Sequence, residues 1–204
     1  LYQYLGWEEI MPKFAHLPLI LKPDGNGKLS KRDGDRLGFP VFPLEWQDPT
    51  TKEVSSGYRE KGYYPESFIN MLAFLGWNPG TSKELYHIEE LIHDFSLERV
   101  GKSGAKFDPE KTKWYNQQHL RLKSKETLVN EIKSTIDYNV SDSYLEGVIE
   151  LMKERATFAN ELLSEKYFFE SPTEYDEKTF RKKWKDNSSS IMDRLFKRIN
   201  LIKA

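Results

Sequence analysis

The sequence contains no cysteine in its 204 residues. This absence excludes disulfide bonds and cysteine-ligated zinc, so we expect no zinc, and it is compatible with a reducing cytoplasm. Long apolar runs are also missing, and without a stretch near the length of a membrane span we expect a soluble chain with no membrane partner. The histidines are scattered, so we interpret them as ordinary polar residues: His16, His87, His93 and His119.

A strong charge imbalance is absent as well, because the formal net charge is only −1. The chain as a whole is therefore no electrostatic attractor of nucleic acid, and any such contact must come from local charge. The hydrophobic fraction of 38% and the aromatic fraction of 14% allow a sizeable core in one or two domains.

The most informative segment that is present is Lys28-Leu29-Ser30-Lys31-Arg32, which follows an apolar run and the turn residues 23–27. Lysine and arginine neutralise phosphate oxygens, and the glycine-flanked backbone lets these cations and a hydroxyl close around a polyphosphate such as ATP. Considered alone, the five residues also fit a solvated basic turn.

Further blocks in the same order make the first interpretation specific. They are Phe14–Leu21, Tyr58–Tyr63, Leu75–Trp77, Leu97–Val100 and Phe107–Lys111. Together with the Lys28–Arg32 segment they resemble the bacterial glutamyl-tRNA synthetases, which are class I aminoacyl-tRNA synthetases with a Lys-Met-Ser-Lys-Arg type loop as their second signature. The resemblance is strong over residues 1–35 and 58–122, and beyond that it is mainly a helical pattern.

This resemblance implies a glutamate–tRNA ligase, which activates glutamate with ATP and transfers it to the 3′ end of tRNA(Glu). It also implies Mg²⁺ bound with the ATP, no metal held by the protein, a monomer and a cytoplasmic location. Lys31 and Lys28 are then the catalytic residues, because late-closing cations stabilise charge that develops on the leaving pyrophosphate. Ser30 and Arg32 complete the implied ATP-binding set, and charging of glutamine tRNA stays open.

The implied fold is mainly α, with α+β character in the N-terminal part. Residues 1–35 resemble the end of a Rossmann-like catalytic domain, residues 36–123 a stem-contact domain, and residues 124–204 an incomplete all-helical anticodon-binding domain. The first class I signature, His-Ile-Gly-His, does not occur in the sequence. We therefore expect this chain alone to be inactive.

The chain departs from the resembled family in two places. Residues 36–55 look like an insertion, and Asp33 stands where a histidine is common. The proline- and aromatic-rich stretch from Gly38 to Trp46 excludes a long helix and favours a small hairpin or an extended flap. Two roles stay open for the insertion: packing of its own aromatic side chains, or contact with substrate or tRNA.

Local patterns predict several elements. Leu17–Leu21 reads as a short buried strand. Helices are expected over Pro65–Leu75, over His87–Asp94, and from Asp108-Pro109, where aspartate is the N-cap and proline the first residue.

Apolar stripes at helical spacing are expected to form the core. The stripe that begins at Leu145 follows Asp142, which is a possible N-cap of its helix. The stripes are Phe68, Ile69, Leu72 and Leu75; Leu128, Val129, Ile132 and Ile136; Leu145, Val148, Ile149 and Met152; and Ile191, Leu195 and Ile199 with Met192 and Phe196.

A basic loop with two glycines precedes the Asp108 helix. Backbone N–H groups, the helix dipole and lysines can together grip an RNA phosphate at such a place. The resemblance assigns this neighbourhood to the stem-contact domain, whereas the residues alone also fit a solvated turn. The candidates for tRNA contact here are Arg99, Lys102, Ser103 and Lys106.

A second basic segment, residues 178–203, carries nine cations against two acidic residues. Phe180 and Trp184 share one helix face in it. Such a segment can bind RNA, but an amphipathic helix with a solvated basic face has the same pattern. Its candidates for tRNA contact are Arg181, Lys182 and Lys185.

Three alternatives remain. The shortened glutamyl-queuosine enzyme lacks an anticodon-binding domain, so the helical pattern from residue 124 argues against it. A glutaminyl enzyme normally carries a barrel after the stem-contact region. The third alternative is a non-catalytic helical RNA-binding or assembly module with a relic loop, and an upstream His-Ile-Gly-His block in the complete gene would argue against it.

Overall fold

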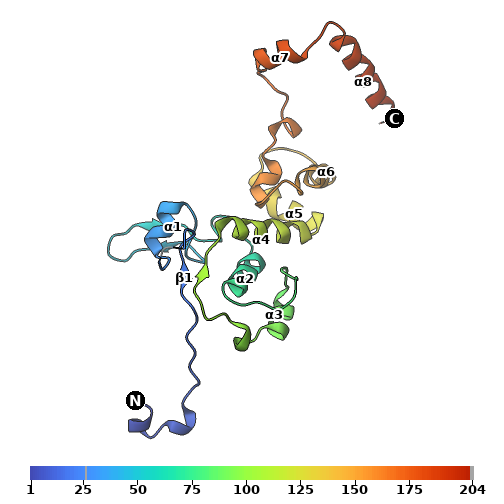
Figure 1. The fold of residues 1–204 in the computed structure, drawn as a ribbon. Coiled ribbons are helices and arrows are strands. Elements are labelled where there is room, and N and C mark those ends of the chain that lie inside the picture. The colour runs from blue at the N-terminus through green and yellow to red at the C-terminus, as the bar shows by residue number, and fades with distance from the viewer. Residues whose placement is uncertain (26, 203–204) are drawn as a thin grey trace. The chain divides into compact units, whose positions relative to one another are not determined.

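The computed structural model describes residues 1–25 and 27–202, without the side chains of Arg32, Asp35 and Ile202. The chain divides into two compact units, Leu1–Ser164 and Glu165–Ala204, which we call the first and the second unit. Helices dominate both units, and short strands occur in the first (Figure 1). The expected class, mainly α with some β structure toward the N-terminus, is confirmed at this level.

The N-terminal part of the first unit contains the 3₁₀ helices η1 (Gln3–Leu5) and η2 (Glu8–Ile10). Strand β1 (Ile20–Leu21) then pairs in parallel with β4 (Ala105–Lys106). Gly104 permits this close approach, because a β-carbon there would lie 2.9 Å from Leu21 Cγ and 3.1 Å from the Leu19 carbonyl oxygen.

The prediction of a buried strand over Leu17–Leu21 is wrong in length and in burial. Only Ile20 and Leu21 form the strand, and the side chains of Leu17 and Leu19 are 65% and 55% exposed. A single partner strand of two residues pairs the backbone of β1, but it supplies too little apolar surface to cover the run.

The Gly38–Trp46 stretch, expected to form a small hairpin or an extended flap, contributes only its last residue to a strand, and residues 46–55 form a small hairpin. This hairpin follows helix α1 (Lys31–Leu37) and consists of the antiparallel strands β2 (Trp46–Gln47) and β3 (Val54–Ser55). Gly57 lies so close to the backbone of Leu44 that a β-carbon would be 2.2 Å from the Leu44 carbonyl carbon. This close packing fixes the base of the hairpin.

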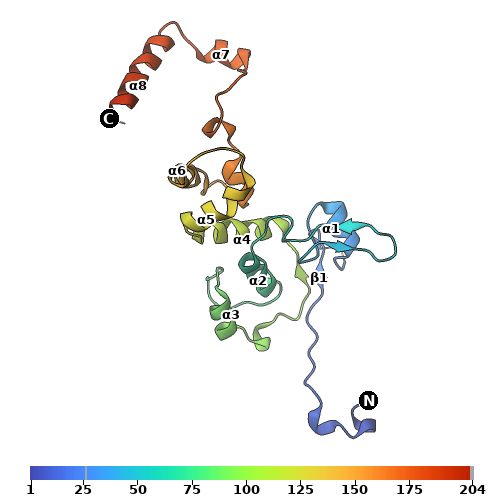
Figure 2. The ribbon, with the colours of Figure 1, turned by 180° about the vertical axis from the view of Figure 1, so that it is seen from behind.

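Helix α2 (Pro65–Phe74) packs along α4 (Pro109–Leu122), and α3 (Ile88–Asp94) packs on α2 (Figures 1 and 2). The 3₁₀ helix η3 (Leu97–Arg99) follows α3. The bounds predicted for α2 and α3 are confirmed to within one residue, and the predicted start of α4 is confirmed with Asp108 as its N-cap. Their core contains Tyr58, Tyr63, Met71, Phe107 and Tyr115.

The predicted core stripe of α2 is wrong in part, because Ile69 and Leu72 are exposed and Asn70 is fully buried. Asn70 Oδ1 accepts a hydrogen bond from the backbone N–H of Tyr86 at 2.8 Å, and its Nδ2 donates to the Glu84 carbonyl oxygen at 2.9 Å. A polar side chain with matched partners therefore sets the buried face of α2.

His119 on α4 is buried in the same core, with Nε2 3.3 Å from Asn70 Oδ1. Burial lowers the pKa of its imidazole. In the unfolded chain a histidine has a pKa of about 6.5, so below about pH 6.5 the unfolded chain binds more protons than the folded one.

The free energy of unfolding is therefore expected to fall as the pH is lowered through about 6.5. Denaturant titrations between about pH 7.5 and 5.5 would measure this. Replacing His119 by Gln should flatten the dependence, whereas His16→Gln, at an exposed position, should leave it unchanged. The same pH dependence in wild type and His119→Gln would contradict the assignment.

Helices α5 (Lys125–Ile132) and α6 (Asp142–Met152) pack against each other and against the 3₁₀ helix η5 (Ala159–Leu163), with η4 (Lys133–Thr135) after α5. The two predicted stripes are core, except that Ile136 lies beyond α5 and is half-buried. The N-cap of α6 is Ser141, one residue before the predicted Asp142, because its hydroxyl accepts a hydrogen bond from the Tyr144 N–H at 3.2 Å.

The second unit contains the 3₁₀ helix η6 (Lys166–Phe168) and the helices α7 (Glu177–Lys183) and α8 (Ser188–Ile202). The apolar stripe of α8 is present but is not core, which corrects the prediction. Ile191, for example, is 50% exposed and Phe196 67%. A unit of this size has too little apolar surface to bury such a helix face.

Candidate functional site

The Lys28–Arg32 segment begins at a tight turn and ends inside a helix. Lys28 forms an isolated antiparallel bridge with Leu21, and the Leu29 N–H donates to the Ile20 carbonyl oxygen at 2.8 Å. Ser30 is the N-cap of α1, and Lys31 is its first residue. The prediction of one continuous loop is therefore corrected, since the loop ends at Ser30.

A capping box explains why the helix begins there. The Ser30 hydroxyl accepts a hydrogen bond from the Asp33 N–H at 3.4 Å and donates to Asp33 Oδ2 at 2.6 Å, while the Ser30 N–H donates to the same oxygen at 3.0 Å. The Ser30 hydroxyl and the Lys22 ammonium hold the pKa of the Asp33 carboxyl well below its usual range. Asp33 is thus an ionised structural anchor of α1.

The cations around this anchor fall into two groups. Lys22 Nζ lies 3.0 Å from Asp33 Oδ1, and Arg36 lies 3.4 Å from the same oxygen. Among the described side chains, Lys28 and Lys31 form no ion pair and are exposed. The side chain of Arg32, also predicted to bind ATP, lies outside the described residues. Both predicted lysines, Lys28 and Lys31, therefore remain available to an anion.

Lys31 has aromatic neighbours that the sequence did not reveal. Its Nζ lies over the rings of Trp46 and Phe42, which are in the stretch 36–55 that was expected to be an insertion. No periodic pattern connects these positions, because the hairpin returns to α1 only in the folded chain. The aromatic content of the stretch beside the Lys28–Arg32 segment was the only available signal.

The four candidates around the basic loop between η3 and β4 face solvent: Arg99 ends η3, Lys102 and Ser103 lie in the loop, and Lys106 belongs to β4. Arg99, Lys102, Ser103 and Lys106 are all exposed. The loop is held at both ends: Val100 forms a bridge with Trp77, and the Ala105 N–H donates to the Leu19 carbonyl oxygen at 3.0 Å.

The predicted use of the α4 N-terminus for a phosphate is wrong. Asp108 Oδ1 already accepts hydrogen bonds from the N–H groups of Glu110 and Lys111, at 2.9 and 3.0 Å. Its carboxylate occupies the place that an anion would take. Contact with phosphate at this loop therefore depends on its side chains.

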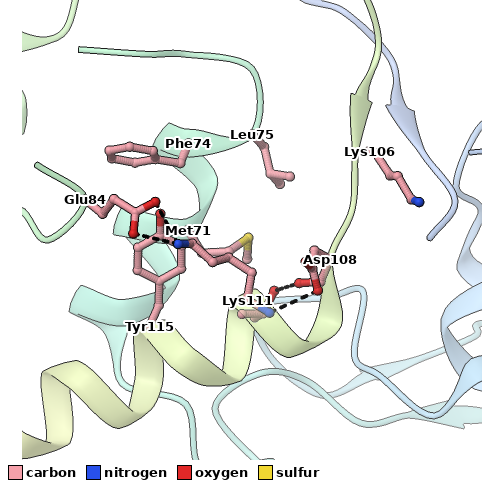
Figure 3. Close-up of a pocket in the computed structure, with 9 residues that line it drawn as sticks. Met71, Phe74, Leu75, Glu84, Lys106, Asp108, Lys111 and Tyr115 are labelled. Atoms are coloured by element: carbon pink, nitrogen blue, oxygen red, sulfur yellow. Dashed lines mark hydrogen bonds and ion pairs between the residues drawn. The ribbon is translucent and has the colours of Figure 1, made fainter. Parts of the chain in front are cut away.

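A pocket of about 240 Å³ lies between α2 and α4 (Figure 3). Lys111 Nζ is 2.7 Å from both carboxylate oxygens of Glu84 and 4.1 Å from the ring centre of Trp114. Lys106, on β4, also lines it, whereas Lys28 and Lys31 do not. Because Lys111 and Glu84 neutralise each other, we interpret this pocket as a structural feature.

The second unit holds the remaining candidates. Arg181 forms an ion pair with Glu177 at 3.2 Å, whereas Lys182 and Lys185 are exposed. The rings of Phe180 and Trp184 stack with 5.0 Å between their centres, so the predicted shared face is confirmed. Arg181, Lys182 and Phe180 thus lie on one short helix, Trp184 is its C-cap, and Lys185 follows directly after it.

Neither a metal-binding cluster nor a membrane-spanning helix is found in the part of the chain that the structure describes. No group of three or more histidine, aspartate or glutamate residues there is arranged to hold a metal ion. None of the described helices is long and apolar enough to cross a membrane.

The two halves of the sequence match two different protein families. Residues 1–114 match the family described as tRNA synthetases class I (E and Q), catalytic domain, and residues 111–203 match the family described as anticodon binding domain. Similar curated proteins are the glutamate–tRNA ligases of Phocaeicola vulgatus, 55% identical over 196 residues, and Parabacteroides distasonis, 53% identical over 193 residues. These alignments cover 94% and 93% of this chain, but only 39% and 38% of the relatives.

Solved structures give the same result. The chain is similar to a glutamate tRNA ligase from Elizabethkingia meningosepticum in complex with its amino acid, with a TM-score of 0.89 and 48% identity over 98% of this chain and 40% of that one. A glutamate-tRNA synthetase from Elizabethkingia anophelis has a TM-score of 0.81 and 51% identity, over 89% of this chain and 37% of the other. The chain thus spans about two fifths of the length of its relatives.

Proposed function

Because the chain belongs to the class I tRNA synthetases of the E and Q type, we propose that it is part of a glutamate–tRNA ligase. In this proposal it supplies the ATP loop and the tRNA-binding parts of the enzyme. The observation that carries the proposal is that Lys28 and Lys31 are exposed and form no ion pair with described residues. About half of the residues of the chain are identical to those of glutamate–tRNA ligases.

The proposed reaction has two steps. In the first step a carboxylate oxygen of glutamate forms a bond to the α-phosphorus of ATP, and the bond from that phosphorus to pyrophosphate breaks. In the second step the terminal ribose 2′-hydroxyl of tRNA(Glu) loses its proton and its oxygen forms an ester bond to the glutamyl carbonyl carbon, while the bond from that carbon to the adenylate oxygen breaks and releases AMP. Lys31 and Lys28 stabilise the charge that develops on the leaving pyrophosphate. Mg²⁺ would accompany the triphosphate, held by ATP and water. The capping geometry of Ser30 supports a role in shaping the loop. Arg32 is proposed either to stabilise the loop or to contact ATP.

The proposed domains are the end of a Rossmann-like catalytic domain over 1–35, a stem-contact domain over 36–123 and an incomplete helical anticodon-binding domain over 124–204. The packing of α2, α3 and α4 supports the second, and the packing of α5 on α6 supports the third. The tRNA contacts assigned to them are the exposed side chains of Arg99, Lys102, Ser103 and Lys106, and of Arg181, Lys182 and Lys185.

Lys102→Ala is expected to weaken tRNA binding about equally for all tRNA sequences, because a phosphate contact carries no base information. The slope of log affinity against log salt should decrease by about 1. Binding titrations of the full-length protein at several salt concentrations measure this. Lys113→Ala is the control, since that lysine is paired with Glu110 at 2.8 Å. An unchanged salt slope in Lys102→Ala would remove this residue from the interface.

The function is tested by aminoacylation with the full-length protein, glutamate, ATP and purified tRNA(Glu) or tRNA(Gln). We expect charging of tRNA(Glu) by the full-length protein, and tRNA binding without ATP chemistry by the 204-residue chain. Binding without any charging would instead favour the non-catalytic RNA-binding module and reduce Lys28–Arg32 to a basic turn.

A further inference from the structure

The inserted hairpin lies against the candidate catalytic lysine. Lys31 Nζ is 4.3 Å from the ring centre of Trp46 and 5.2 Å from that of Phe42. The two rings stack, with 5.0 Å between their centres and 23° between their planes. Both distances lie within the range of about 6 Å in which an ammonium group is attracted to an aromatic face.

The segment that carries both rings is firmly attached to the first unit. The Phe42 carbonyl oxygen accepts a hydrogen bond from the Tyr58 N–H at 2.9 Å, and the Glu45 N–H donates to Glu60 Oε2 at 2.7 Å. Tyr58 is itself a buried core residue. The rings are half-buried, whereas Lys31 is exposed. The aromatic pair is thus a fixed surface for a flexible side chain.

This contact directs Lys31 without neutralising it. An aromatic face attracts the ammonium group but offers no carboxylate oxygen, so its N–H donors remain available to phosphate. Lys22 and Arg36, in contrast, both form ion pairs with Asp33.

A carboxylate also lies beyond the rings. The N–H groups of Thr51 and Thr50 lower the pKa of the Asp48 carboxyl, and Lys31 makes a smaller contribution to this lowering. The lysine therefore faces an electron-rich surface and forms no ion pair with a described residue.

We propose that Trp46, together with Phe42, is a positioning residue for Lys31 in adenylate formation. The rings hold the four-carbon side chain on the hairpin side of α1, so it loses less conformational freedom when it contacts the leaving pyrophosphate. The insertion at 36–55 then acts on the reaction through Lys31. This role rests on the proposed function, because it requires Lys31 to contact ATP.

The kinetic test uses ATP–pyrophosphate exchange by the full-length protein. Trp46→Ala should lower kcat about 2- to 5-fold, the effect of losing an exposed cation–π contact, and leave the KM for glutamate unchanged. Trp46→Phe should restore most of the rate, and Val54→Ala, an exposed change on the same hairpin, should have no effect. In a Lys31→Ala background, Trp46→Ala should cause no further loss. An unchanged or faster kcat in Trp46→Ala, or the same loss in both backgrounds, would overturn the proposal.

A direct test of the contact does not depend on activity. In the full-length protein with ¹³C-labelled lysine, ring currents should shift the Lys31 ε-methylene protons upfield, and Lys31→Arg identifies the signal. The shift should disappear in Trp46→Ala and persist in Val54→Ala. Its absence in the folded wild type would overturn the inference alone. A wild type with the shift but without exchange activity would overturn the proposed function, and the positioning role with it.

Discussion

Replacement of Lys31 by alanine in the full-length protein is expected to slow glutamate-dependent ATP–pyrophosphate exchange by about 100-fold or more. Lys31 is exposed, forms no ion pair with described residues and is the first residue of α1. Its charge is therefore available where negative charge develops on pyrophosphate, and its loss should lower kcat much more than glutamate binding.

Two measurements make this expectation specific. Single-turnover adenylate formation separates the chemical step from product release. Lys61→Ala is the matched control, because it removes an exposed lysine of the same unit that lies outside the Lys28–Arg32 segment. Near-normal adenylate formation by Lys31→Ala would remove the residue from catalysis.

The second large effect is expected for the stability of the first unit. Asn116 on α4 is fully buried and joins three segments. Its Oδ1 accepts a hydrogen bond from the Tyr64 N–H at 2.9 Å, and its Nδ2 donates to the carbonyl oxygens of Thr157 and Gly62 at 2.7 and 3.4 Å. Asn116→Ala removes the partner of the buried Tyr64 N–H and of the part-buried Thr157 carbonyl oxygen, so the free energy of unfolding should fall by about 3 kcal/mol.

Denaturant unfolding of wild type and variants measures this loss. Gln117→Ala, at the half-buried neighbouring position of the same helix, is the control and should change the free energy of unfolding by less than about 0.5 kcal/mol. A loss below about 1 kcal/mol in Asn116→Ala would mean that water or a backbone shift satisfies the abandoned groups.

Elements with local start signals were predictable from the sequence, and α4 is the clearest case. Asp108 and Pro109 specify its first turn within two residues, so no distant contact is needed. Helix α1 was missed although its signal is equally local: Ser30 and Asp33 have the spacing of a capping box. The motif and the turn residues before it favoured a loop instead.

Burial was harder to predict, because it depends on which partner arrives. The buried face of α2 is set by two hydrogen bonds of Asn70, which accepts from the Tyr86 N–H and donates to the Glu84 carbonyl oxygen. The apolar spacing of Ile69 and Leu72 gives no sign of them. In the same way, the candidate lysines follow from the motif, but the aromatic surface under Lys31 follows only from the path of the hairpin.

The short β1–β4 ladder also limits how the two candidate binding segments can be engineered. β1 leads directly into the turn that carries Lys28, and β4 ends the loop that carries Lys102 and Ser103. At Gly104 any larger side chain would press on Leu21 and on the Leu19 carbonyl oxygen. A mutation meant to alter only the proposed RNA contacts would therefore also displace the backbone that leads to the proposed ATP loop, so residue 104 is a poor site for separating the two proposed functions.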